Sequence, residues 1–365
     1  MELTWVAANA LSGAVIAQLD PISWECSDPL TGAGSATLTL PAPRTRGQAT
    51  RLRELTELDA LTYALHDRVG RVLWAGVITS RGWRRREGQV TVTATDWRSW
   101  FYQRMRFATG YSATDVEQAT VWSQLVNASL NHAGAPKMVL NPPLADGVLR
   151  TLYLPLYSVY GQVFDDLSRS DQGLEWWVEG TWADDKQRSI MLQVRVGTRG
   201  SGNVSPFLQS GPSGGNVLDY EWPEDGTERR TRIVALGEGI APDQVWASDE
   251  HPDLAAGGVL LRESVSGPYA GVMKVSRAFA LARSERAARS AAVQTVQLTV
   301  RADQPVVGAY ATGDRVRLSL IDEWLDVDEA AVRLLDRSIR GGRAEPTTAS
   351  LTLDMNDVEM PEGAG

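Results

Sequence analysis

The feature of this sequence that most constrains its fold is a set of short segments in which apolar or small residues alternate with polar ones. In the first hundred residues these segments are 35–40, 61–65, 72–79 and 89–95, with turn residues at 67–70. A period of two is typical of a strand that buries one face, and short turns between such strands favour antiparallel pairing. The first hundred residues are therefore predicted to form a small antiparallel β-barrel or sandwich.

The pattern changes near residue 100, where helical spacing replaces alternation. One helix is predicted from Thr114 to His132, capped by Thr114 or Asp115. A second is predicted to begin near Leu156, because one face collects apolar residues at 160, 163, 164 and 167. Strands at 174–178 and 189–196 complete an α+β middle domain over residues 101–215. The stretch 197–216 is rich in glycine, serine and proline, and it is interpreted as a linker or a long exposed loop.

The last part of the chain returns to alternating segments and is predicted to form a second strand-rich domain over residues 216–365. Its strands are expected at 231–236, 293–301, 315–321, 331–339 and 349–354. A loop at 238–258 and a helix at 276–292, rich in alanine and arginine, form an insertion within 238–292. Residues 360–365 have nothing to bury and are expected to be disordered.

Two segments of the chain share one layout. Residues 63–96 and 317–354 each contain a strand that ends in an acidic turn, a longer strand that ends in arginine and glycine, and a threonine-rich strand. The identity between them is low, so two interpretations stay open: an internal duplication, or unrelated antiparallel strands of similar length.

Composition argues against several classes of function. The formal net charge of −9 argues against a DNA-coating role, because such binding depends on clustered lysine and arginine. The single cysteine, Cys26, cannot form an internal disulfide or a cysteine-based metal site, and we expect a reducing compartment. No apolar run approaches the roughly 18 residues of a membrane span. The N-terminus has no basic segment before an apolar one, so we expect no secretory signal.

The sequence contains no recognisable catalytic motif. His66, His132 and His251 are predicted to lie in a turn, at a helix end and in a loop, and no G-x-S-x-G, H-E-x-x-H or P-loop pattern is present. Adjacent carboxylates suggest glycoside hydrolysis at first sight, but neighbouring side chains point in different directions, so solvated turns and helix faces are favoured. These pairs are Asp165–Asp166, Asp184–Asp185 and Asp322–Glu323. We therefore predict no enzyme activity, no catalytic residue, and no cofactor or metal site.

Arginine and tryptophan clusters suggest contact surfaces. The run Arg84–Arg86 is predicted to form a hairpin tip, which could touch an acidic partner or nucleic acid. Arg283, Arg286 and Arg289 form a stripe on the last helix, for which a solvated face is favoured over docking. Among thirteen tryptophans, Trp74 and Trp176 are predicted to be buried, with Trp177 on the opposite face. Core and interface roles are favoured, and stacking on sugar rings is the alternative.

Four segments carry a family resemblance. They are 73–79 (L-W-A-G-V-I-T), 92–97 followed by Arg104, 160–167 followed by 173–176, and Tyr310 followed by 313–318. In this order they resemble the tail hub proteins of long-tailed phages, especially the minor tail proteins of actinobacterial siphophages. That family is related to the contractile-tail baseplate hub and to the spike base of type VI secretion systems.

The resemblance implies a mainly β, α+β fold: two small antiparallel β-barrels, at 1–100 and within 216–365, with an α/β middle unit inserted. It implies a structural hub at the distal end of a phage tail, assembled in the host bacterial cytoplasm. Three chains with two barrels each form a pseudo-sixfold ring around the DNA channel, which joins a sixfold tail tube to a threefold tip. The implied partners are two further copies of the chain, the distal tail protein, the tail tube, the tape measure and tip or fibre proteins, with DNA only passing through.

The resemblance supplies no catalytic residues. Because the chain stops at Gly365, shortly after the second barrel, we expect any cell-wall hydrolase or receptor-binding module to be a separate polypeptide. A carbohydrate- or receptor-binding tail module, suggested by the tryptophans, is the alternative function. A tail-associated hydrolase is a third.

Overall fold

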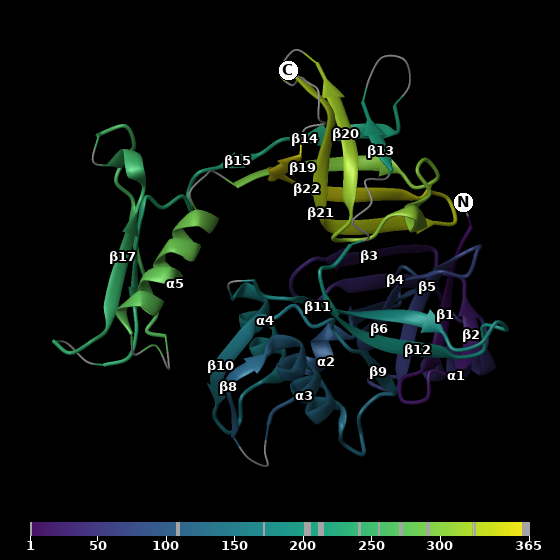
Figure 1. Cartoon of the computed structure of the whole chain (residues 1–365). Coiled ribbons are helices and arrows are strands. Elements are labelled where there is room, and N and C mark those ends of the chain that lie inside the picture. Colours follow the sequence, from purple (N-terminus) through teal and green to yellow (C-terminus); the bar gives the residue numbers. More distant parts are fainter. Residues whose placement is uncertain are drawn as a thin grey trace. The chain divides into compact units, whose positions relative to one another are not determined.

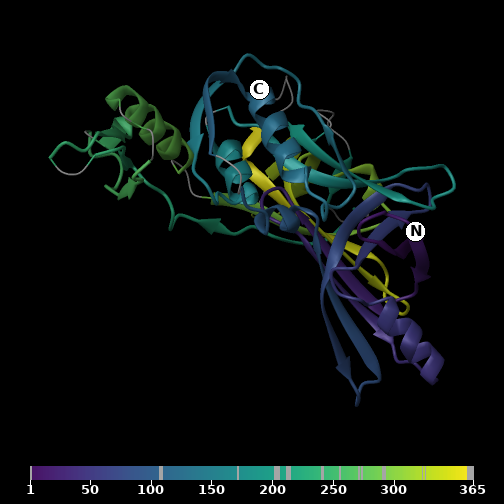
Figure 2. The same cartoon turned by 90° about the horizontal axis from the view of Figure 1, so that it is seen from below.

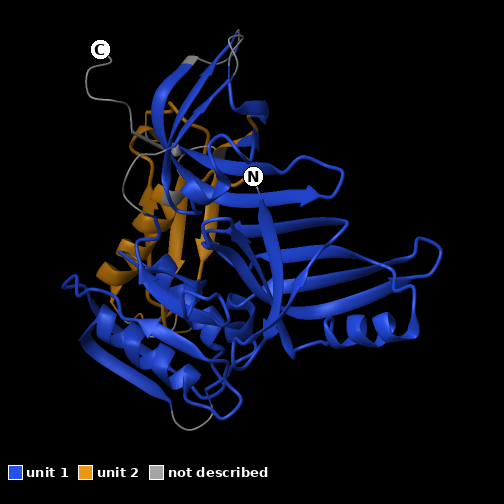
Figure 3. Ribbon diagram, turned by 90° about the vertical axis from the view of Figure 1, so that its right-hand side faces the viewer, with its two compact units in different colours: residues 1–221, 297–365 blue, residues 222–296 orange. Residues whose placement is uncertain are grey.

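The structure is a computed structural model of the chain. It describes residues 2–106, 110–170, 172–200, 206–210, 215–239, 242–254, 256–269, 272, 274–289, 293–322, 324 and 326–359. Strands predominate over helices, which confirms the mainly β, α+β prediction. The chain divides into two compact units, unit 1 (residues 1–221 and 297–365) and unit 2 (residues 222–296), coloured blue and orange in Figure 3.

The N-terminal strands of unit 1 form a curved antiparallel sheet in the order β3-β4-β7-β6-β5-β1-β2. They are β1 (Leu3–Asn9), β2 (Val15–Leu19), β3 (Ser23–Pro29), β4 (Ser35–Pro41), β5 (Leu61–Asp67), β6 (Val72–Arg84) and β7 (Gln89–Asp96). The ring of Trp5 lies 5.6 Å from that of Trp24 and 5.8 Å from that of Trp74. Because four strands lie between β1 and β3 in the sheet, the contact between Trp5 and Trp24 requires the sheet to curl around its inner face.

The C-terminal strands of unit 1 form a second sheet region in the order β14-β19-β22-β21-β20-β13. They are β13 (Phe207–Gln209), β14 (Val217–Glu221), β19 (Val293–Arg301), β20 (Arg315–Ile321), β21 (Asp326–Gly342) and β22 (Thr348–Glu359), with the 3-10 helix η2 (Val307–Ala309) between β19 and β20. Buried aliphatic side chains such as Leu298, Leu318 and Leu353 alternate with polar ones along these strands.

The two predicted barrels are not separate sheets. The first part of β21 pairs with β20, and its last part, Asp336 to Gly342, pairs with β3. Figure 1 shows β21 and β3 side by side. Among the described residues the strands of both regions therefore belong to one hydrogen-bonded sheet, which has 14 strands when β15 (Glu224–Asp225), paired with the start of β19, is included.

The repeated layout is confirmed at the level of strand order. The run β4-β7-β6-β5 in the first region matches β19-β22-β21-β20 in the second. A β-bulge between Ile78 and Ser80 interrupts the β6–β7 ladder, and a bulge between Leu334 and Asp336 lies at the corresponding place in the β21–β22 ladder. Bulges are specific local features of a sheet, so agreement in both order and bulge position favours the duplication over chance.

The connection between β4 and β5 contains a helix that the sequence analysis missed. This helix, α1 (Arg46–Glu54), begins with a capping box between Thr45 and Gln48. None of its residues is buried, so it lacks the apolar periodicity from which a helix can be predicted.

The middle part of unit 1 combines short strands with three helices around one apolar core. Its elements are α2 (Arg98–Tyr102), β8 (Tyr111–Glu117), α3 (Gln118–Leu130), β9 (Met138–Asn141), β10 (Leu149–Leu154), α4 (Tyr160–Arg169), β11 (Glu175–Trp182) and β12 (Ile190–Gly197). Phe101, Trp122, Phe164 and Trp176 form the aromatic centre of the core. As predicted, one face of α4 is buried in it.

The predicted start of the helix at Thr114 is wrong. Residues 111–117 form β8, and α3 begins after Glu117, whose carboxylate accepts a hydrogen bond from Thr120 N at 3.1 Å. The backbone and side chain of Asp115 bond instead to the Thr151 hydroxyl of β10. This partner lies 36 residues away, so the local cap signal did not reveal it.

Unit 2 is a small α+β body. A three-stranded sheet of β16 (Arg232–Leu236), β17 (Trp246–Glu250) and β18 (Glu263–Ser266) contacts α5 (Val275–Ala288) through Ile233, Ala235 and Ala282. Unit 2 also contains β15 (Glu224–Asp225) and the 3-10 helix η1 (Pro252–Leu254). The prediction of an unbroken loop at 238–258 is wrong, because β17 pairs along its whole length with β16. The predicted end of α5 at residues 290–292 and the predicted disorder at 360–365 lie outside the described residues.

Candidate functional site

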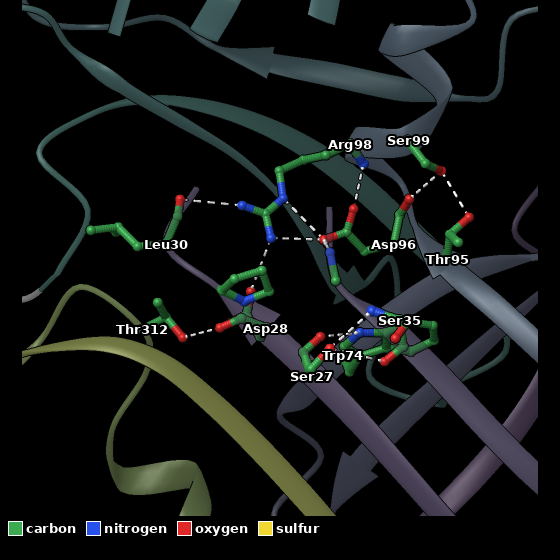
Figure 4. Close-up of polar contacts among 12 residues, drawn as sticks. Ser27, Asp28, Leu30, Ser35, Trp74, Thr95, Asp96, Arg98, Ser99 and Thr312 are labelled. Atoms are coloured by element: carbon green, nitrogen blue, oxygen red, sulfur yellow. Dashed lines mark hydrogen bonds and ion pairs between the residues drawn. The ribbon is translucent and has the colours of Figure 1, made fainter. Parts of the chain in front are cut away.

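The most elaborate polar cluster in unit 1 lies where β3 meets β21. We call it the joint and define it as Asp28, Asp96, Arg98, Arg199 and Arg337. Arg199 Nη2 lies 2.7 Å from both carboxylate oxygens of Asp28, Arg98 Nη2 lies 3.5 Å from Oδ1, and Arg337 Nη2 lies 3.7 Å from Oδ2. Figure 4 shows Arg98 held between Asp96 and Asp28. One carboxylate therefore holds arginines from three distant parts of the chain.

Backbone contacts fix the position of the joint. Arg337 Nη1 donates to the carbonyl oxygens of Val307 and Tyr310, at 3.2 and 2.6 Å, and Nη2 donates to Leu73 O at 3.1 Å. The Thr312 hydroxyl donates to Asp28 O. A guanidinium presents several donors in one plane, which allows Arg337 to connect both sheet regions at once.

The middle part of unit 1 is tied to the same place. Glu175 of β11 accepts from Arg333 Nη2 and from Arg199 N, both at 2.7 Å. Arg333 lies in β21 and Arg199 shortly after β12. Both sheet regions and the middle part thus converge on one network of charges.

Burial and charge act in opposite directions on the acids of the joint. Burial alone raises the pKa of Asp28, but the attraction of Arg199, Arg337 and Arg98 outweighs it and holds that pKa below its usual range. Asp28 is therefore ionised at neutral pH. In the same strand, burial raises the pKa of the Cys26 thiol to about 12, so this cysteine stays protonated.

A polar cavity of about 280 Å³ adjoins the joint. Asp28, Asp96, Arg199, Arg337 and Trp177 are among the residues that line it. Its charged groups are already engaged with one another, so the arrangement is suited to holding the two sheet regions in place. Within the described residues, no group of three or more histidine, cysteine or acidic side chains could hold a metal ion.

The three histidines lie in different environments. His66 lies within β5 rather than in the predicted turn, with its ring 5.3 Å from that of Trp182. His132 follows the end of α3, and its Nδ1 accepts from Gly134 N. His251 Nδ1 accepts from Asp253 N in the loop after β17. The contacts of His132 and His251 are local and fix turns, whereas His66 meets the ring of a tryptophan that is distant in the sequence.

Of the three adjacent carboxylate pairs, Asp165 and Asp166 diverge as expected. Asp165 accepts from the Tyr102 hydroxyl at 2.8 Å and from Trp176 Nε1 at 3.1 Å, whereas the side chain of Asp166 is 79% exposed. Asp184 closes a turn by accepting from Arg188 N. Asp322 accepts from Trp324 N, and its neighbour Glu323 lies outside the described residues.

The basic runs have different surroundings. Arg84 ends β6, and Arg85 and Arg86 form the exposed hairpin tip that the sequence predicts. In α5, Arg286 is paired with Asp249, and Arg289 lies 3.1 Å from Glu285. The stripe was favoured as a solvated face, but two of its three members are engaged with acidic residues of unit 2.

The tryptophan predictions are confirmed where they name a residue. Trp74 and Trp176 are each 5% exposed, and Trp177 lies on the other face of β11, beneath the Arg199 guanidinium at 5.8 Å. The most exposed tryptophans are Trp83, Trp246 and Trp324, and they come from different elements.

No pattern in the sequence predicted the joint. Its members are single charged residues scattered along the chain, and no local spacing links them. Asp28 and Arg199 are 171 positions apart. The only available signal was the expectation that buried arginines need carboxylate partners.

None of the described helices has the length and apolar character that a membrane-spanning helix needs. No protein-family model matches the chain, and no curated protein matches it by sequence.

Solved structures do match, at low identity and over most of the chain. A tail protein from Neisseria meningitidis MC58 matches with a TM-score of 0.62 and 14% identity over 96% of both chains. The 43 kDa tail protein of prophage MuSo2 from Shewanella oneidensis matches with a TM-score of 0.60 and 13% identity, over 97% of this chain and 98% of that one. An Escherichia coli component of the type VI secretion system, described as similar to the T4 tail proteins gp27 and gp5, gives 0.50 and 11%, over 92% of this chain and 73% of that one.

The chain therefore has the fold of phage tail proteins and of type VI secretion components related to them. The resemblance found in the sequence is confirmed at the level of the fold.

Proposed function

We propose that this protein is a structural tail hub at the distal end of a phage tail, where it surrounds the channel through which DNA leaves. The observation that carries the proposal is the pair of sheet regions that share the order of four strands and are fused at the joint, in a fold shared with a tail protein over 96% of the chain. A rigid ring segment needs such a fused pair, whereas an enzyme needs a cleft with convergent reactive groups.

The proposed assembly is a homotrimer. Each chain contributes two similar sheet regions, so three chains place six similar regions around one axis. The ring then has true threefold and approximate sixfold symmetry, which lets it join a sixfold tail tube to a threefold tip. Closed cyclic assembly also covers strand edges that a single chain exposes.

The proposed channel wall is acidic or neutral. The net charge of −9 supports this, because a basic wall would hold DNA through many phosphate contacts. The exposed arginines at 84–86 are then expected to face protein or solvent. In unit 2, the ion pairs of Arg286 and Arg289 already direct the arginine stripe toward acidic residues.

The proposed partners are two copies of this chain, the distal tail protein, the tail tube, the tape measure and tip or fibre proteins. In this proposal the protein is not an enzyme and needs no cofactor, and it is part of the virion tail tip.

The mass of the purified chain in solution tests the proposal. Sedimentation or native mass spectrometry should give three times the 39.8 kDa chain mass, and tail proteins should be recovered with the tagged chain from infected cells. A chain that remains monomeric at every concentration and binds host glycans would contradict the hub and favour the carbohydrate-binding alternative.

A further inference from the structure

An unpaired strand edge occupies the distal half of β6. The β5–β6 ladder ends at Val77, and from Ser80 to Arg84 β6 pairs with no described strand other than β7. The side chains of this half are exposed, including 52% of Trp83. Figure 2 shows the β6–β7 hairpin, in blue, projecting from unit 1 with α1 near it. An exposed edge with a large aromatic residue invites strand pairing.

The second repeat shows what covers such an edge. The matching bulges align Ile78 with Leu334, so distal β6 corresponds to the part of β21 that begins at Asp336. That part of β21 is paired with β3. Ile339 takes the place of Trp83 and is only 1% exposed. Distal β6 is thus the same structural element without its partner strand.

Two arginines confirm this alignment. Arg81 Nη1 donates to Arg53 O and Thr56 O, which lie in and just after α1. Its counterpart Arg337 donates through the same atom to two carbonyls in and just after η2. Helix α1 lies in the connection between β4 and β5, and η2 lies in the connection between their counterparts, β19 and β20.

The counterpart of β3 in the second repeat is β14. Ala42 N donates to Gly88 O where β4 ends, and Ala302 N donates to Thr347 O where β19 ends, which fixes the register of β4 against β19. In this register Leu38 corresponds to Leu298, and their partners on the next strand are Trp24 of β3 and Tyr220 of β14.

β14 is itself an uncovered edge. It lies at the end of the sheet, and none of its five residues is buried. Leu218 is 55% exposed. Each repeat therefore leaves one strand edge whose counterpart in the other repeat is covered.

The pairing between β21 and β3 predicts the register between the two free edges. Arg340 lies opposite Glu25 and Gly342 opposite Ser23. Transferred to the counterparts, Arg84 lies opposite Glu221 and Arg86 opposite Asp219. Two arginines on one face of the hairpin tip then meet two carboxylates on one face of β14.

We propose that residues 80–86, the distal half of β6 and its hairpin tip, in one copy pair antiparallel with residues 219–225 of a second copy, which run from the end of β14 into β15, with Arg84 opposite Glu221 and Arg86 opposite Asp219. The pairing rests on the proposed trimer and supplies its contact between chains. Repeated three times, it closes a ring in which contacts within and between chains alternate. The geometry also gives the arginine run at 84–86 an acidic protein partner.

A groove beside the free edge fits this arrangement. An apolar cavity of about 450 Å³ lies between α1 and distal β6, lined by Ala49, Leu52, Trp83 and Val90 among others. An incoming strand places alternate side chains toward this cavity and away from it.

A pair of cysteines tests the register directly. Residues directly opposite on antiparallel strands have Cα atoms about 4.5–5.5 Å apart, within the range for a disulfide. The full-length chain carrying Arg84→Cys and Glu221→Cys should therefore form covalent dimers and trimers under mild oxidation. The matched control carries Arg84→Cys and Leu218→Cys, which the register separates by about 10 Å, so it should not cross-link. Cys26 can stay in place because it is buried and protonated.

Charge reversal gives a second measurement. Arg84→Glu alone should weaken trimer formation about tenfold per interface, and adding Glu221→Arg in the same chain should restore it. A trimer that cross-links at 84–221 and not at 84–218, with restoration by the double reversal, supports the pairing. A trimer with no 84–221 cross-link overturns the pairing but leaves the hub proposal standing. A monomer with no cross-link at any concentration overturns both.

Discussion

Replacing Asp28 with asparagine tests how much the negative charge of this residue contributes to the stability of the fold. The substitution keeps the size of the side chain and leaves three guanidinium groups without their shared carboxylate. The side chains of Arg98, Arg199 and Arg337 are only 3%, 9% and 4% exposed. Removing one partner of a buried ion pair costs about 3–5 kcal/mol. We expect the lower end, about 3 kcal/mol, because the side chain of Asp28 is 17% exposed and Arg98 retains Asp96.

In urea denaturation at pH 7, this loss should appear as a lower urea concentration at the unfolding midpoint. The slope of the free energy of unfolding against urea concentration should stay unchanged. Asp20→Asn is the matched control, because Asp20 forms an ion pair with Arg343 in which the side chains are 78% and 48% exposed. An exposed pair contributes at most about 1 kcal/mol. If Asp28→Asn costs no more than Asp20→Asn, the joint does not hold the two sheet regions together as described.

The pH dependence gives an independent check. The pKa of Asp28 is lowered in the folded state, so its charge contributes stability above the unfolded pKa of about 3.9. That contribution is lost as the pH falls through the lower folded pKa. The difference in free energy of unfolding between wild type and Asp28→Asn should be full at pH 7 and should shrink below about pH 4. A difference that stays constant down to pH 3 contradicts the electrostatic explanation.

Three further predictions follow from single positions. Gly76→Ala should destabilise the fold by more than about 1 kcal/mol in thermal unfolding, because a Cβ at this position would lie 2.3 Å from Thr95 O. Gly82→Ala is the control and should be nearly neutral, because a Cβ there would meet nothing within 4 Å. Cys26 should resist a thiol reagent at pH 8 in the native protein and react fully in denaturant, since burial raises its pKa to about 12; rapid native labelling would contradict its burial. Purified protein should release nothing from host peptidoglycan, and turnover that Asp165→Ala, Asp166→Ala or Glu175→Ala abolishes would show an active site after all.

The strands that bury one face could be predicted because their alternation is local. Residues 293–301 and 315–321 form strands with the predicted bounds, and the buried face of α4 follows from its spacing. The solvated helix α1 and the strand β17 were missed, since neither shows a clear apolar period. The extension of β21 to Gly342 was also missed, because its partner β3 comes from the other end of the chain.

The lack of a catalytic motif led to the prediction that the histidines and adjacent carboxylates have separate, ordinary surroundings. No motif in the sequence predicted the joint. Its charges come from β3, β7, α2, the segment after β12, and β21. Only the folded sheet brings these elements together. The repeat, in contrast, was visible in the layout of residues 63–96 and 317–354, and the structure adds the registers and bulges that make it usable for predicting an interface.

The symmetry of the assembled particle at the level of this protein tests the central claim most directly. An electron cryomicroscopy map of the tail tip should show three copies of the chain, with six similar curved sheet regions alternating around an open channel. Six copies, or a single copy, at that level would contradict the proposed ring.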